Sequence, residues 1–196
     1  ASIERASLSL PPAGRWQLAD GLDARWAAGE LALSPHRWAG EFGMLEVDAL
    51  AAAPASVDVE ARLVDIPLEI AESWLPGNFR VTGVANAAID LQRQGSDWSG
   101  TLSWRQDGTA VTVADLNDET VTIRVPEAVA DATLAGGGAV GRASLAVEPG
   151  LRATLDVELA DLGLPESMHA ELRVTGDDFG WVPALVPAID NVAGTV

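Results

Sequence analysis

The sequence contains no cysteine, no tyrosine and no lysine, and only two histidines among its 196 residues. Without cysteine the chain forms no disulfide, offers no thiolate nucleophile and holds no metal through sulfur. This fits a reducing cytosol, and it equally fits an oxidising compartment in which a domain of this size needs no disulfides. His36 and His169 are far apart, and no serine or acidic constellation accompanies either. The sequence therefore does not support a catalytic triad or a histidine-based zinc site.

Basic residues are scarce: 12 arginines stand against 29 acidic residues, which gives a net charge of −17. A nucleic-acid-binding protein neutralises phosphates with a basic surface, so nucleic acid is not an expected partner. Flat adsorption on anionic lipid headgroups is disfavoured for the same reason. The charge suits a protein whose copies repel one another in solution.

Long apolar runs are also missing. No segment approaches the roughly 18 consecutive apolar residues of a membrane-spanning helix. The sequence is nevertheless 48% apolar, so it can bury a substantial core and is not expected to be disordered. It begins with neither a signal peptide nor a methionine, and its last residues, Gly194 to Val196, are expected to start a new strand. We expect a piece cut from the interior of a longer protein.

Alternation with a period of two dominates the chain and predicts β-strands with one apolar face. Turn residues separate the alternating segments at roughly 10–15-residue intervals, as in a meandering antiparallel sheet. Gln106-Asp107-Gly108 and Gly136 to Gly138 are two of these predicted turns. No long amphipathic helix stands between the strands, so a βαβ fold is not expected. The alternating segments are 57–63, 85–91, 111–113, 121–125, 143–147, 151–159 and 168–174.

One spacing occurs twice. Trp74-Leu75-Pro76 and Leu185-Val186-Pro187 are each followed, seven residues after the proline, by a glycine, Gly83 or Gly194. A recurring order with variable insertions is typical of stacked, quasi-one-dimensional folds. We predict one continuous domain over residues 1–196, with repeat-like units at about 57–113 and 151–196. Short helical turns are predicted before each repeated proline, at about 67–75 and 179–186.

Two motifs have residues typical of ligand-binding sites but lack the sequence context that such sites need. The segment 136–141 fits G-x-G-x-x-G, but alternating residues follow it where a dinucleotide fold needs a helix, so it predicts a turn. Asp115, Asn117, Asp118 and Glu119 are oxygen ligands without EF-hand spacing, which indicates an acidic hairpin tip rather than a calcium site. No cofactor and no metal is predicted, and no pair of carboxylates stands out as an acid–base couple.

Tryptophan is the abundant aromatic residue, with seven copies. Two segments that start at Trp38 and Trp98 share the pattern W-x-G-x-[FL]. Tryptophan rows on a sheet can stack on sugars, but more often they cover the edge of a core. Core packing is the favoured interpretation. A carbohydrate-binding or hydrolytic β-domain is kept as one candidate function of the chain.

The apolar faces of the strands must be hidden from water. A second sheet can cover them, as in a sandwich, or the sheet can curl around them. A curled sheet that stays open exposes a large apolar patch, which in a protein of this charge implies a ligand or partner.

Several motifs occur together in this sequence: Ile66-Pro67-Leu68, Trp74-Leu75-Pro76 with Gly83-Val84, Trp98-Ser99-Gly100-Thr101-Leu102, and Phe179-x-Trp181 with Leu185-Val186-Pro187, Ile189-Asp190 and Gly194. Together they resemble the TamB family and, more broadly, the AsmA-like proteins. The resemblance is clearest over about residues 57–113 and 151–196.

This resemblance implies an all-β fold, a long, curled and mainly antiparallel sheet called a β-taco, with an apolar interior. It also implies a non-enzymatic role in the periplasm of a Gram-negative bacterium, within a protein anchored in the inner membrane. The implied cargo is phospholipid or unfolded outer-membrane protein strands, including autotransporters, and the implied partner is the outer-membrane barrel protein TamA. The expected function is a hydrophobic conduit or chaperone for outer-membrane biogenesis, and the alternative is a structural or adhesive β-sandwich domain of a bacterial surface protein.

The alternating rows supply the expected lining of the groove. An apolar lining removes the cost of exposing acyl chains, about 0.8 kcal/mol for each CH₂ group, without fixing their position. The predicted groove residues are Val57, Val59, Leu63, Ile66, Leu68, Ile89, Leu91, Val111, Val113, Leu155, Val157 and Leu159.

Overall fold

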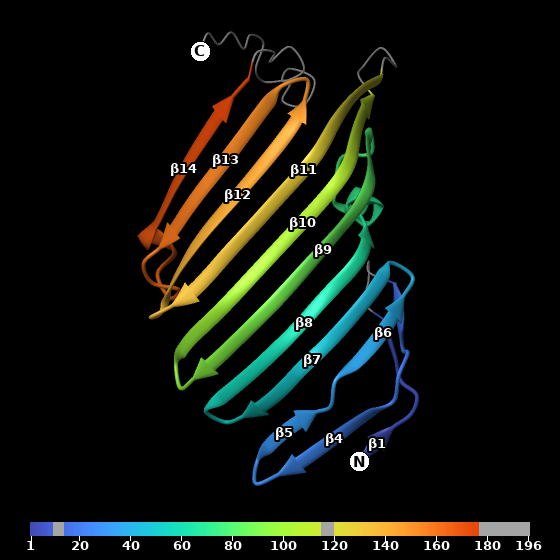
Figure 1. Cartoon of the computed structure of the whole chain (residues 1–196), viewed down its shortest axis with the longest axis vertical. Helices are drawn as coiled ribbons and strands as arrows, with labels where there is room; N and C mark the ends of the chain where they lie inside the picture. Colours follow the sequence, from blue (N-terminus) through green and yellow to red (C-terminus); the bar gives the residue numbers. More distant parts are fainter. Residues whose placement is uncertain (10–13, 115–119, 177–196) are drawn as a thin grey trace.

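The structure is a computed structural model, and it describes residues 1–9, 14–114 and 120–176. These residues form 14 strands and two short 3₁₀ helices (Figure 1). The strands are β1 (Ser2–Ile3), β2 (Ser7–Ser9), β3 (Arg15–Leu18), β4 (Leu22–Ala27), β5 (Glu30–Leu33), β6 (His36–Gly40), β7 (Gly43–Ala53), β8 (Ser56–Pro67), β9 (Phe79–Gln94), β10 (Asp97–Ala114), β11 (Thr120–Ala135), β12 (Gly138–Glu148), β13 (Leu151–Leu159) and β14 (Met168–Thr175). The helices are η1 (Leu68–Trp74) and η2 (Pro165–Ser167).

All described strands belong to one sheet, and every pairing in it is antiparallel. From β7 to β14 each strand pairs with the next in the sequence, so the sheet is a continuous meander (Figure 1). At β7 the sheet branches. One half of β7 pairs with β5, which leads to β4 and β1, and the other half pairs with β6, which leads to β3 and β2.

The predicted fold class is confirmed: the chain is all-β, with a single large antiparallel sheet that curls and does not close. The described residues therefore do not form the two packed sheets of a sandwich. The helical turn predicted at 67–75 is η1, whereas the one predicted at 179–186 lies outside the described residues, as do residues 177–196 of the second repeat-like unit.

The curl follows from which side chains are buried. Strand pairing puts alternate residues on the same side of the sheet, and we call the side that carries Ile89, Trp104 and Leu155 the inner face. Every described strand residue with a buried side chain lies on this face, and no second layer of described strands covers it, so the sheet curves around it. The buried residues are Trp16, Leu18, Leu22, His36, Val47, Ala61, Val81, Ala85, Gln106, Thr109, Val113, Ile123, Val125, Ala128, Val147 and Leu151.

One predicted turn is wrong. Gln106-Asp107-Gly108 does not reverse the chain, because β10 continues through it to Ala114. The register with β9 shifts between Asp107 and Ala110, and Gly108 has a positive φ of 65°. The extra residue forms a β-bulge, which bends the strand and brings Gln106 and Thr109 to the same face. The turn predicted at 136–138 is confirmed, since Gly136 and Gly137 have positive φ and β12 follows directly.

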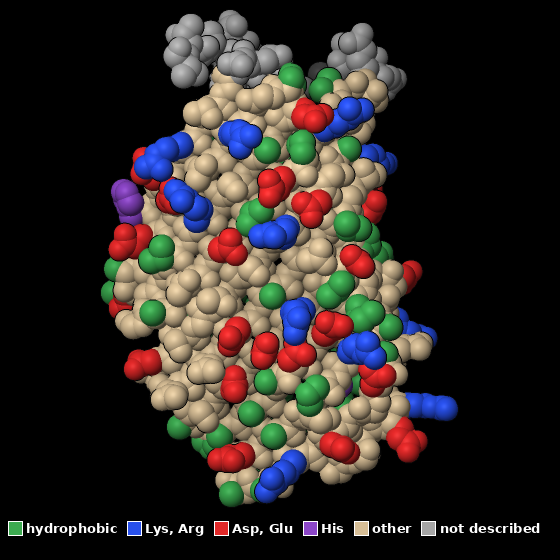
Figure 2. Space-filling model, in the orientation of Figure 1, with side chains coloured by type: hydrophobic (Ala, Val, Ile, Leu, Met, Phe, Trp, Pro, Cys, Tyr) green, Lys and Arg blue, Asp and Glu red, His purple; other side chains and the backbone are tan. Residues whose placement is uncertain are grey.

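The opposite face, which we call the outer face, carries the charges. Figure 2 shows acidic and basic side chains interspersed over the strands on the side that faces the viewer. Cross-strand ion pairs lie on this face, including Arg142 with Asp156 at 2.8 Å and Arg173 with Asp156 at 3.1 Å. These pairs are half exposed and each contributes little to stability. Their effect is to make one face of the sheet strongly hydrated.

Gly100 lies where β9 and β10 approach closely. Its φ is 138°, and a Cβ atom placed there would collide with the carbonyl oxygen of Asp90. We expect Gly100→Ala to destabilise the protein by about 2–3 kcal/mol, because it adds backbone strain and a clash. Gly95→Ala is the matched control, since Gly95 also has a positive φ but faces open space, and about 1 kcal/mol is expected there. Equal losses in thermal unfolding for the two variants would contradict this account.

Candidate functional site

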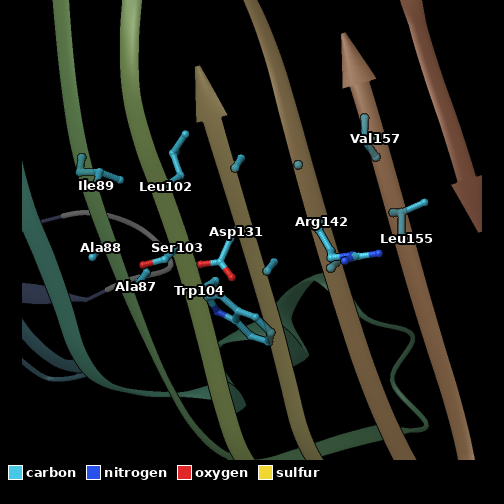
Figure 3. A pocket seen from close by; sticks show the side chains of 14 residues that line it. Ala87, Ala88, Ile89, Leu102, Ser103, Trp104, Asp131, Arg142, Leu155 and Val157 are labelled. Atoms are coloured by element: carbon cyan, nitrogen blue, oxygen red, sulfur yellow. The ribbon is translucent and has the colours of Figure 1, made fainter. Parts of the chain in front are cut away.

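The inner face contains an apolar hollow of about 400 Å³ near the middle of the sheet. Ile89 of β9, Leu102 and Trp104 of β10, and Leu155 and Val157 of β13 line it (Figure 3). The small residues Ala130 and Ala143 form its floor on β11 and β12. Small residues on β11 and β12 lie between larger ones on β10 and β13, which leaves room that a protein core would normally fill.

The hollow continues across the sheet. A second hollow of about 260 Å³ shares Trp104, Ala143 and Leu155 with the first and extends to Leu172 on β14. Leu155 is 37% exposed and Leu172 is 65% exposed. The two hollows together form an open apolar groove that runs across strands β9 to β14.

The groove has one closed and one open margin. At the closed margin, Ile123, Val125, Ala128, Val147 and Leu151 form a cluster of buried side chains. The open margin is formed by the strand ends next to the turns at 95–96 and 136–137, and by Met168, which is 59% exposed. The buried cluster does not extend to this margin.

The pairing register places eleven of the twelve predicted groove residues on the inner face. Val157 and Leu155 line the first hollow, as does Ile89. Val113 is buried, at 3% exposure, and belongs to the packed part of the face. Leu68 is not on a strand, because it begins η1. The residues placed on the inner face are Val57, Val59, Leu63, Ile66, Ile89, Leu91, Val111, Val113, Leu155, Val157 and Leu159.

Sequence reasoning missed part of the lining. Leu102, Trp104 and Ala143 line the hollow but were not among the predicted residues. Alternation in the sequence could have identified these residues, since one alternating row along β10 consists of Trp98, Gly100, Leu102 and Trp104. That row was interpreted as a tryptophan motif at the edge of a core, and Trp104 does contact the buried cluster.

Polar groups on the buried part of the inner face are few. Gln106 is 2% exposed and its Nε2 donates a hydrogen bond to the carbonyl oxygen of Val125 at 3.1 Å. His36 is 6% exposed, with Nδ1 at 2.7 Å from the carbonyl oxygen of Ser34. The hydroxyl of Thr109 is buried without a hydrogen-bond partner. Gln106 and Thr109 lie on β10 and His36 lies on β6, and the three side chains do not form a reactive constellation.

Several charged groups of the outer face form ion pairs across neighbouring strands. Arg62 donates to Asp48, and this hydrogen bond, together with the charge of Asp48, raises the pKa of Arg62 above its ordinary value. Among the described residues, no three His, Asp or Glu side chains are placed to hold a metal ion. The acidic residues Asp115 to Glu119, where a calcium loop was considered, lie outside the described residues. No helix in the described ranges has the length and apolarity needed to cross a bilayer.

An open, curled β-sheet with a charged outer face and an apolar inner groove is the class of protein that these features define. A family model described as TamB, N-terminal domain, matches residues 1–196, and the chain belongs to the TamB family. The family takes part in outer-membrane assembly as a non-enzymatic component, and its members span the periplasm from an anchor in the inner membrane. No curated protein and no solved structure matches the chain.

Proposed function

We propose that this chain is a section of a periplasmic hydrophobic conduit whose inner groove carries the acyl chains of phospholipids during outer-membrane biogenesis. The observation that supports the proposal is the open apolar groove across β9 to β14, with Leu155 more than a third exposed in a protein of net charge −17. Such a patch is costly in water and is stabilised when a ligand covers it.

The chemistry of the groove fits a sliding cargo. Its lining makes no directional hydrogen bonds, so a chain gains about 0.8 kcal/mol for each CH₂ group wherever it lies. The position of the cargo is therefore weakly fixed. The hydrated outer face keeps the sheet in solution while the groove is occupied.

Apolar segments of unfolded outer-membrane proteins, autotransporters included, are the second cargo. The strand β14 favours it, because all eight of its residues are exposed and no other described strand pairs with its second edge, which could pair with an incoming strand. We further propose that residues 1–196 form one continuous segment of the conduit, and that TamA is contacted by other parts of the protein.

Photocrosslinking in cells tests the proposal. A photoreactive amino acid replaces Val157, which lines the groove, in the complete protein, and the matched control replaces Glu158, the next residue on β13, which lies on the outer face. We expect phospholipid to be crosslinked from position 157 and not from position 158, since neighbouring strand residues point to opposite faces.

Crosslinks from position 157 to outer-membrane proteins, with no lipid, would replace the lipid cargo with the protein cargo. Crosslinks only to the protein's own chain would contradict the conduit, because they would mean that the groove is closed in the cell.

A further inference from the structure

Among the residues that the structure describes, the inner face carries one side chain with a permanent charge. Among the described strand residues that pairing places on this face, Arg93 alone is an arginine, and none is aspartate or glutamate. Arg93 lies near the end of β9, beside Val57 of β8 and Trp98 of β10, at the open margin of the groove. With 29 acidic residues elsewhere in the chain, a lone cation on the apolar face needs an explanation.

Arg93 has no acidic partner. None of the ion pairs in the described part of the chain involves it, and its Nε is buried without a hydrogen-bond partner. Its guanidinium carbon lies 5.7 Å from the centre of the Trp98 ring. This cation–π contact positions the guanidinium but leaves its donors free, and a buried unpaired donor costs free energy until it meets an acceptor.

The groove begins next to this cation. Leu91 and Gly100, then Ile89 and Leu102, follow Arg93 and Trp98 along the same face, and the last two line the first hollow. Ile89 is four residues from Arg93, which is about 13 Å along an extended strand. A cation at the margin and an apolar groove starting within this distance match the two ends of an anionic amphiphile.

We propose that Arg93, held against Trp98, binds the oxyanion headgroup of an amphiphile, a phosphate or a carboxylate, whose hydrocarbon chain lies in the groove. This inference rests on the proposed function and adds a fixed polar contact to a lining that is otherwise non-directional. A guanidinium suits the role because its planar donors can engage two oxygens of the headgroup at once. Selectivity for anionic over neutral amphiphiles then depends on one residue.

Binding of matched amphiphiles to the purified protein tests the site. The probes are dodecyl phosphate, dodecyl maltoside as the uncharged amphiphile with the same chain, and inorganic phosphate, all followed by calorimetry. We expect dodecyl phosphate to bind about tenfold or more tightly than dodecyl maltoside, as a charge-assisted hydrogen bond predicts. Arg93→Gln should remove this preference and leave the affinity for dodecyl maltoside unchanged.

Arg105→Gln is the matched control, since it removes the same charge from the exposed outer face of β10. It should leave the preference intact. Arg93→Lys keeps the charge but not the two-pronged donor geometry, and an intermediate preference is expected even if Arg93→Gln folds poorly.

A preference that survives in Arg93→Gln would overturn the headgroup site while leaving the groove in place. Inorganic phosphate that binds as tightly as dodecyl phosphate would also overturn it, because the site would then be one for free anions. If neither amphiphile binds the unmodified protein, the proposed function fails instead.

Discussion

Leu155→Asp is expected to weaken the binding of a hydrophobic chain more than tenfold while leaving the protein folded. Leu155 lines both hollows of the groove and is 37% exposed, so a carboxylate there stays partly hydrated and can remain ionised. It would keep hydrocarbon away from the surrounding lining. If the carboxylate keeps only two CH₂ groups of the ligand out of the groove, binding becomes weaker by about 1.6 kcal/mol, which lowers the affinity more than tenfold. The lost apolar burial should lower stability by only about 1–2 kcal/mol.

Calorimetry with dodecyl maltoside measures the affinity, and thermal unfolding measures the stability. Thr154→Asp is the matched control, because it puts the same charge on the adjacent residue of β13, on the outer face beside Arg173. It should bind dodecyl maltoside like the unmodified protein. Full binding by Leu155→Asp would mean that the hydrocarbon chain does not lie in this groove.

Ile123→Asp is expected to unfold the protein or to lower its stability by about 3–5 kcal/mol. Ile123 is 6% exposed and packs with Val125, Ala128, Val147 and Leu151, so the new carboxylate is buried without a partner. For a protein of this size such a loss lowers the melting temperature by roughly 10 °C. Differential scanning calorimetry of the variant and the unmodified protein provides the measurement.

The loss should depend on pH in a direction that identifies its cause. Burial raises the pKa of the introduced carboxyl in the folded state above its unfolded value of about 3.9. The variant is therefore least destabilised below that unfolded value, where the carboxyl is neutral in both states, and loses stability as the pH rises through the folded pKa. Ile123→Asn, which does not titrate, should be destabilised by an amount that does not follow this trend. If Ile123→Asp lowered the stability as little as Leu155→Asp does, the side chains at the closed margin would not form a packed cluster.

Much of the fold could be predicted from alternation alone. The row from Leu151 to Leu159 is β13 with the predicted ends, and pairing with β12 puts its odd-numbered residues on the inner face. Alternation works because a strand with one hydrated and one apolar face must repeat every two residues. It failed at Gly108, where a positive φ produced a bulge within β10 instead of a turn, because a glycine permits either outcome and the sequence of one strand does not contain its partner's register.

The groove was harder to predict than the sheet. Alternation identifies which residues share a face, but the curvature of the sheet decides which of them are buried. Val113 and Leu155 belong to equivalent apolar rows, yet one is 3% exposed and the other 37%. Arg93 lies outside the predicted alternating segment 85–91, although it continues the row of Ala87, Ile89 and Leu91 by one more step. A charge at the end of an apolar row is also what an ordinary turn looks like, so only the pairing with Trp98 reveals its place on the inner face.

Native mass spectrometry of the purified protein, before and after extraction with organic solvent, tests the central claim most directly. An open apolar groove predicts that the protein purifies with bound phospholipid, that extraction removes it, and that Leu155→Asp purifies without it. A protein that carries no lipid under conditions that preserve its fold, with identical masses for the unmodified chain and Leu155→Asp apart from the substitution itself, would contradict the conduit.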